Sequence, residues 1–245
     1  MKIFKSIFLT LYKIWVFLVF TVFMLIFLPG LVLPHFFGLR AGSIGYFFLW
    51  LWSWIFSILT FIRYEFYGRE NFRKGKAYVL VSNHTSFLDL PGLRMLIPGQ
   101  FRPLAKKELK KLPVFGWIAQ GATIIVDRSS HESRKKSIDK LKSVLRQGIS
   151  ILIFAEGTQN RTKEILQPFH DGAFRIAIDT QQPILPISVV GAGRLMPPGT
   201  IKLRPGKIKI YVGQEIPTEG LAVSEVSVLK QKTFDIMKKM IVESN

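Results

Sequence analysis

The chain has 245 residues, no cysteine, and 34 lysines and arginines against 16 acidic residues, which gives a formal net charge of +18. The absence of cysteine excludes disulfides, cysteine-ligated metals and a thiol nucleophile. The strong positive charge favours anionic partners such as lipid headgroups, nucleic acid or acidic substrates.

The N-terminal part is almost entirely apolar and carries two long uncharged runs, at residues 14–33 and 41–62. Each run is about 20 residues long, which at ~1.5 Å per residue matches the ~30 Å hydrocarbon core of a bilayer. The tight connection between them predicts a helical hairpin. Lysines precede the first run and Arg63 follows the second, so the positive-inside rule puts both ends on the cytoplasmic side.

The composition changes at about residue 63, because all acidic residues lie after it. We therefore divide the chain into a membrane-anchoring hairpin, residues 1–63, and a second domain, residues 64–245. A hairpin that crosses the bilayer twice and one that is sunk into a single leaflet both fit the pattern. Pro29, Pro34 and the tryptophans at 50–54 keep the shallower arrangement open, since tryptophan favours the interfacial layer.

From residue 64 onward, short runs rich in valine and isoleucine alternate with longer stretches of helical pattern. The predicted strands are 76–82, 121–128, 149–155, 183–191 and 207–213, and the predicted helices are 86–97, 131–148, 171–180 and 224–244. This alternation predicts an α/β fold, with a mostly buried mixed sheet flanked by helices and preceded by the N-terminal apolar helical hairpin.

Residues 81–90, VSNHTSFLDL, place His84 directly after a predicted strand and Asp89 five positions later. Ligands of open α/β sheets bind at the carboxyl ends of the strands. A histidine that must take a proton works best when a carboxylate holds its other ring nitrogen. The structural alternative is that Ser86 and Asp89 form a capping box and His84 is an ordinary turn residue. The spacing by itself leaves both interpretations open.

Other candidate residues also stand at the ends of β-like segments. Glu156, Gly157 and Thr158 follow one predicted strand, where glycine lets backbone amides approach an anion and threonine adds a donor. Lys106 and Arg128 end two further segments. Each charge alone is typical of a solvated surface, but together they surround the strand ends with cations, as a phosphate-bearing substrate requires.

The segments that carry these residues resemble a known family. NHTSFLDLPGL, PLAKKEL, GATIIVDR, FAEGTQNR and PILPISVVG occur in the order and at the separations of the glycerolipid acyltransferases, most closely the bacterial 1-acyl-sn-glycerol-3-phosphate acyltransferases. The resemblance covers about residues 65–215. It implies acyl transfer from acyl carrier protein or coenzyme A to the 2-hydroxyl of lysophosphatidic acid, giving phosphatidic acid for phospholipid synthesis.

The resemblance also implies roles for individual residues. His84 is implied as the general base, with Asp89 as its partner. Lys106, Arg128 and the loop 156–158 are implied as substrate-binding elements. No metal or other cofactor is needed. Residues 64–245 become an acyltransferase domain, and the expected location is the inner membrane, with this domain on its cytoplasmic face.

The third motif of this chain departs from the family pattern. The family usually has Phe-Pro-Glu-Gly-Thr-Arg, whereas here Ala155 replaces the proline and Gln159 the arginine. Glutamine offers only neutral hydrogen bonds in place of a bidentate cation. We expect Arg161, two residues on, to supply the missing phosphate contact, and a different acceptor headgroup is the alternative.

The sequence leaves two alternatives to this function open. One is an acyltransferase of the same fold that acts on another lysolipid or on glycerol 3-phosphate, and another is a non-catalytic membrane protein that gathers anionic lipid. A nucleic-acid partner is not expected, because the chain has no motif that reads DNA or RNA.

Overall fold

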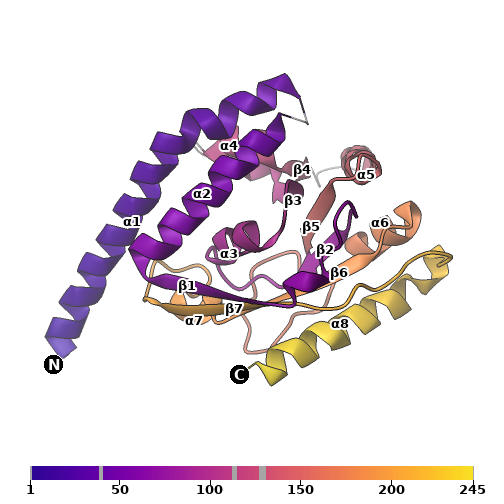
Figure 1. Ribbon diagram of the computed structural model, residues 1–245. Coiled ribbons are helices and arrows are strands. Elements are labelled where there is room, and N and C mark those ends of the chain that lie inside the picture. The colour runs from indigo at the N-terminus through magenta and orange to yellow at the C-terminus, as the bar shows by residue number, and fades with distance from the viewer. Residues whose placement is uncertain (1, 39–40, 112–114, 127–130, 245) are drawn as a thin grey trace.

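The computed structural model describes residues 2–38, 41–111, 115–126 and 131–244. Within them the chain forms layers: the apolar hairpin and a short helix cover one face of a seven-stranded sheet, and further helices cover the other face (Figure 1). This arrangement confirms the predicted α/β fold with a mostly buried mixed sheet and an N-terminal apolar hairpin.

The hairpin consists of α1 (Lys2–Val32), the short 3-10 helix η1 (Leu33–Phe37) and α2 (Gly42–Thr60). Both α-helices are long and apolar enough to cross a membrane. Gly30 lets them approach closely, since a Cβ at this position would lie 2.5 Å from the ring of Phe48. At the open end of the hairpin, the Tyr12 hydroxyl donates to the carbonyl oxygen of Thr60 at 2.6 Å.

Helix α2 lies between α1 and the α/β domain (Figure 1). The guanidinium of Arg94 donates to the carbonyl oxygens of Tyr46 on α2, at 3.0 Å, and of Ile97, at 2.8 Å. The Tyr46 hydroxyl in turn donates to the carbonyl oxygens of Phe101 and Ala122. One apolar cluster also continues from the hairpin into the sheet. Burial at this contact lowers the pKa of the Arg94 guanidinium to about 10.

The sheet has the strand order β1-β7-β6-β2-β5-β3-β4. All neighbours are parallel except β6 and β7, which are antiparallel. The strands are β1 (Ile62–Tyr67), β2 (Val79–Ser82), β3 (Phe101–Lys106), β4 (Ile124–Val126), β5 (Ser150–Phe154), β6 (Ile184–Val190) and β7 (Gly206–Val212). Strand β1 was not predicted, because it begins directly at the end of an apolar run and so crosses the proposed boundary at residue 63.

Alternation along the central strands explains why both faces of the sheet are buried. Val79 and Val81 of β2 face one apolar cluster, together with residues of α5, α6 and α8, whereas Leu80 faces the cluster shared with the hairpin. Each face therefore needs its own layer of helices, as in other sheets with parallel strands.

The remaining helices are α3 (Asp89–Leu96), α4 (Phe115–Ala122), α5 (His131–Arg146), α6 (Gly172–Thr180), α7 (Ala192–Leu195) and α8 (Val226–Glu243), with short 3-10 turns η2 (Arg69–Asn71), η3 (Lys107–Lys111) and η4 (Val223–Glu225). The predicted helix 86–97 begins later, at Asp89, because 86–88 form a turn. The predicted strand 121–128 begins later, at Ile124, because α4 extends to Ala122, and its last two residues, 127–128, lie outside the described residues.

The registers of the central strands bring the predicted site residues to one edge of the sheet. Ser82 at the end of β2 pairs with Phe154 at the end of β5, and also with Ile187 of β6. The loops that follow β2 and β5 are therefore neighbours, although His84 and Glu156 lie 72 residues apart in sequence.

Candidate active site

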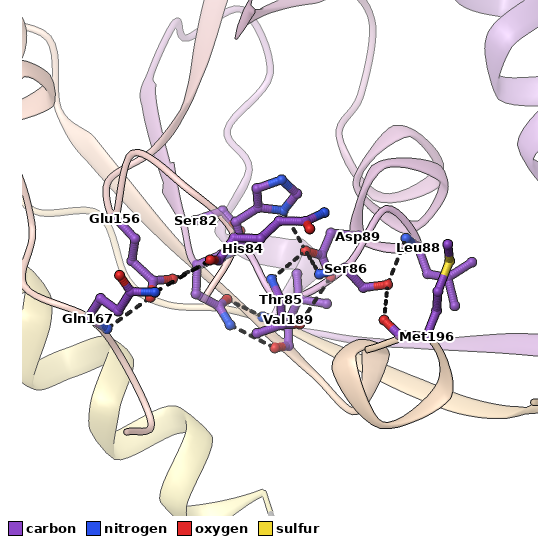
Figure 2. A network of polar contacts seen from close by, with 12 residues as sticks. Ser82, His84, Thr85, Ser86, Leu88, Asp89, Glu156, Gln167, Val189 and Met196 are labelled. Atoms are coloured by element: carbon purple, nitrogen blue, oxygen red, sulfur yellow. Dashed lines mark hydrogen bonds and ion pairs between the residues drawn. The ribbon is translucent and has the colours of Figure 1, made fainter. Parts of the chain in front are cut away.

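His84 and Asp89 are in direct contact in the loop between β2 and α3. The Nδ1 atom of His84 lies 2.8 Å from Oδ2 of Asp89 (Figure 2). A carboxylate can only accept, so Nδ1 carries the proton and donates it in this hydrogen bond. The lone pair of the neutral ring is then at Nε2, which has no hydrogen-bond partner among the described residues. This is the tautomer that a general base requires.

Asp89 is completely buried, and backbone amides hold its carboxylate in place. Its Oδ2 also accepts from the backbone N–H of Thr85 at 2.8 Å and of Ser86 at 2.9 Å. The Ser86 hydroxyl accepts from the N–H of Leu88 at 3.2 Å. Helix α3 begins at Asp89 without a side-chain cap, so the predicted capping box with Ser86 at the N-cap is wrong, and Asp89 holds both the turn 85–86 and the ring of His84.

Glu156 holds the backbone of His84 from the opposite side to Asp89 (Figure 2). Its Oε1 accepts from the N–H of His84 at 3.0 Å, and its Oε2 accepts from the N–H of Gln167 at 2.8 Å. Only 3% of Glu156 is exposed. Burial raises the pKa of the Glu156 carboxyl, while the two backbone N–H groups act in the opposite direction. Both carboxylate oxygens are thus occupied within the protein.

Further contacts restrict the histidine. The backbone N–H of Asn160 donates to the carbonyl oxygen of His84 at 2.7 Å. The imidazole stacks on the ring of Phe154, with 4.1 Å between the ring centroids and 18° between the planes. The side chain remains 16% exposed, which leaves one edge of the ring accessible. The strand β5 and its loop therefore position both the backbone and the ring of His84.

The buried asparagine before the histidine was missed in the sequence. The side-chain Nδ2 of Asn83 donates to the carbonyl oxygen of Val189 at 2.9 Å, and its Oδ1 accepts from the N–H of Val189 at 2.7 Å. Asn83 thus continues the pairing of β2 with β6 beyond the last strand residue. A polar residue between an apolar strand and a candidate base was the available signal.

The predicted substrate-binding residues are placed as follows. Thr158 and Lys106 are exposed, and Gly157 has a φ of +72°, which favours glycine. Strand β5 lies between β2 and β3, so Lys106 stands two strand spacings, ~10 Å, from the line of β2. Arg128 lies outside the described residues. The substrate-binding roles of these residues remain predictions.

Arg161 is exposed and lies against the loop that follows α7. A Cβ at Gly199 in that loop would be 3.2 Å from its Nη2 atom. The same loop contacts the histidine turn, because the Ser86 hydroxyl donates to the carbonyl oxygen of Met196 at 2.8 Å (Figure 2). Gln159, in contrast, has a buried Nε2 with no hydrogen-bond partner among the described residues. Arg161 is therefore an exposed cation next to the loop that contacts the histidine turn.

Three comparisons with known proteins support the fold and the motifs. The acyltransferase family model matches residues 63–190. An acyltransferase of Schizosaccharomyces pombe is 35% identical over 190 residues, which cover 76% of this chain and 68% of the relative. Human 1-acyl-sn-glycerol-3-phosphate acyltransferase alpha is 33% identical over 70% of this chain, and the Saccharomyces cerevisiae 1-acyl-sn-glycerol-3-phosphate acyltransferase is 31% identical over 72%.

The matched region spans 61% of the human relative and 59% of the Saccharomyces cerevisiae relative. The crystal structure of the 1-acyl-sn-glycerophosphate acyltransferase from Thermotoga maritima has the same fold, with a TM-score of 0.83, 21% identity, and coverage of 98% of this chain and 97% of that chain.

Proposed function

We propose that this chain, which belongs to the acyltransferase family, transfers an acyl group from acyl carrier protein or acyl-CoA to the 2-hydroxyl of 1-acyl-glycerol 3-phosphate. The product is phosphatidic acid. One observation carries the proposal: His84 is held through Nδ1 by the buried Asp89, while Nε2 is left for a substrate proton. The names of the relatives support the choice of acceptor.

The mechanism is a direct transfer without an acyl-enzyme intermediate. His84 Nε2 removes the proton of the 2-hydroxyl as its oxygen attacks the thioester carbonyl carbon. The tetrahedral intermediate then collapses, the C–S bond breaks, and the leaving thiolate takes the proton back from the imidazolium. Asp89 contributes by stabilising the imidazolium while it exists. Lys106, Arg128, Thr158 and Arg161 are proposed to hold the acceptor phosphate.

The proposed division of the chain makes residues 1–63 the membrane anchor and residues 64–245 the acyltransferase domain. We place the hairpin in a single leaflet, because α2 is covered by α1 on one side and by the α/β domain on the other. Crossing the bilayer would carry that charged domain into hydrocarbon. The outer face of α1 suits lipid, since Phe4, Phe8, Leu11 and Ile14 are all more than half exposed.

A labelling experiment tests this placement, which puts the acyltransferase domain on the cytoplasmic face of the inner membrane. The chain has no cysteine, so Phe36→Cys at the hairpin turn is a unique label site. With the hairpin in one leaflet, a membrane-impermeant maleimide added outside intact cells leaves the protein unlabelled, and permeabilisation allows labelling. Labelling from outside before permeabilisation would indicate a two-pass hairpin, whereas release by high-pH carbonate would indicate peripheral attachment.

The proposed reaction is tested with purified full-length protein in lipid vesicles. Thiol release is followed with acyl-CoA and with acyl carrier protein as donors, against lysophosphatidate, other lysolipids and glycerol 3-phosphate. We expect thiol release with lysophosphatidate that matches phosphatidic acid formed, mole for mole. Release only with another acceptor would favour the alternative acyltransferase function, and lipid binding without any thiol release would favour a non-catalytic lipid-binding protein.

Gln159 and Arg161 give a prediction about the acceptor phosphate. A charged hydrogen bond contributes ~1.5–3 kcal/mol against ~0.5–1.5 for a neutral one, so Arg161→Ala is expected to raise KM for lysophosphatidate about tenfold or more. Gln159→Arg is expected to lower KM. Each variant is assayed on lysophosphatidate and on a phosphate-free lysolipid. A wild type that prefers the phosphate-free acceptor, with Arg161→Ala silent, would show that the headgroup differs.

A further inference from the structure

A hollow lies under the turn of the hairpin, at the edge of the sheet opposite to the histidine loop. Its volume is about 530 Å³. Arg102 and Ile124 in its wall come from the amino ends of β3 and β4, whereas His84 follows the carboxyl end of the parallel strand β2. The hollow is therefore separate from the proposed active site. Its described lining residues are Val32, Phe36, Gly38, Arg102, Trp117, Gln120, Gly121, Thr123, Ile124, Lys140 and Val144.

The charged part of this wall is entirely positive. Arg102 and Lys140 contribute to it, and none of the lining residues that the structure describes is acidic. Neither cation forms an ion pair with an acid among the described residues. A hollow with two unpaired cations and no carboxylate attracts an anion.

Arg102 is a deeply buried cation in the wall of the hollow. Only 3% of the residue is exposed, and its Nη1 has no hydrogen-bond partner within the described part of the chain. The guanidinium interacts with the side chain of Tyr46, whose ring centroid lies 5.2 Å away, and its Nη2 is 3.5 Å from Oε1 of Gln100, so neither of these partners is a carboxylate. A buried guanidinium without a counter-ion is costly, and an anionic ligand would offset that cost.

Apart from Gln120 and Thr123, the rest of the wall has no polar side chain among its described residues, and it continues onto the exposed apolar surface. Phe36 of the hairpin turn is 79% exposed and Trp117 of α4 is 60% exposed, and both line the hollow. If the hairpin lies in one leaflet, as proposed above, the mouth of the hollow opens at the level of the lipid. An occupant with both an anionic group and an apolar part matches these walls.

We propose that this hollow binds an anionic membrane phospholipid, with its phosphate toward Arg102 and Lys140 and its chains along Phe36 and Trp117. The inference rests on the proposed membrane placement of the hairpin, but it does not depend on acyl transfer. A soluble phosphate ester has the same charged chemistry without the apolar part, so the experiment must separate these two sources.

The test uses the full-length protein with a photo-crosslinking amino acid at Gln120, an exposed lining residue. The protein is placed in phosphatidylcholine vesicles with or without a minor fraction of phosphatidylglycerol, with no acyl donor present, and lipid adducts are identified by mass spectrometry. We expect phosphatidylglycerol to be enriched in the adducts about tenfold over its share of the vesicle, as one charge-assisted contact predicts.

Substitutions in the same crosslinking protein test the charged contacts. Lys140→Gln, at an exposed lysine, is expected to lower the enrichment several-fold, and Arg102→Gln to abolish it. Lys238→Gln on α8 removes the same charge at an exposed position that does not line the hollow, and it should change nothing. Should Arg102→Gln fail to fold, Lys140→Gln still decides the question.

Two results would overturn the proposal. The first is adduct formation in proportion to vesicle composition, with Lys140→Gln silent. The second is complete suppression of lipid crosslinking when millimolar glycerol 3-phosphate is present during irradiation, which would make a soluble phosphate ester the occupant. Because no acyl donor is present, either result leaves the proposed reaction to be judged by thiol release alone.

Discussion

His84→Ala is expected to lower the rate of acyl transfer to lysophosphatidate by ~10²-fold or more, with the fold intact. The imidazole is 16% exposed, and the ring contacts that alanine removes are those to Asp89 and Phe154. The backbone contacts of His84 with Glu156 and Asn160 need no side chain and should remain. The loss should therefore appear in kcat rather than in the melting temperature.

Asp89→Asn is expected to lower kcat by a comparable or somewhat smaller factor. Oδ2 of Asp89 accepts from His84 Nδ1 and from the N–H groups of Thr85 and Ser86. An amide keeps one acceptor oxygen but loses the charge that stabilises the imidazolium. If the amide oxygen of the variant accepts from the N–H groups of Thr85 and Ser86, the imidazole of His84 loses the acceptor that keeps the proton on Nδ1 and the lone pair on Nε2.

The measurement for both variants is thiol release under saturating acceptor, beside far-UV circular dichroism and thermal unfolding. Asp235→Asn, at an exposed position on α8, is the matched control and should behave as wild type. Near wild-type turnover by a folded His84→Ala protein would rule out the mechanism proposed here.

Glu156→Gln is expected to lower kcat by about 10²-fold, with little change in KM. Glu156 accepts one N–H from His84 and one from Gln167, and glutamine has only one acceptor oxygen. Its NH₂ group would face one of these donors, so a buried N–H would lose its partner at a cost of ~1–3 kcal/mol. A shift of the His84 backbone by a fraction of an ångström then misaligns the base, and misplacement of ~1 Å can cost 10²-fold.

The separation of kcat from KM distinguishes positioning from substrate binding. The alternative role predicted for Glu156 is a contact with the substrate, and its loss would raise KM while leaving kcat nearly unchanged. Glu164→Gln, at an exposed residue of the same loop, is the matched control. An increase in KM alone for Glu156→Gln would therefore refute the positioning role.

Local features of the chain were predictable from the sequence because they depend on neighbours in the sequence. Each apolar run of the hairpin corresponds to one helix, although α1 already begins at Lys2, and five predicted strands correspond to β2, β4, β5, β6 and β7. His84 and Asp89 are five residues apart across a turn, so the start of one helix is enough to bring them together. Only their roles had to be inferred from the resemblance to a family.

The tertiary structure decided the features that join distant segments. Glu156 was expected at the substrate, but parallel pairing of β2 with β5 places its carboxylate under the backbone of His84, which no local pattern indicates. The apolar runs did not indicate how deeply the hairpin lies in the membrane, because both arrangements need the same apolar residues. The single-leaflet placement is a proposal that rests on the packing of α2 against both α1 and the α/β domain, a contact between distant segments that no apolar run indicates.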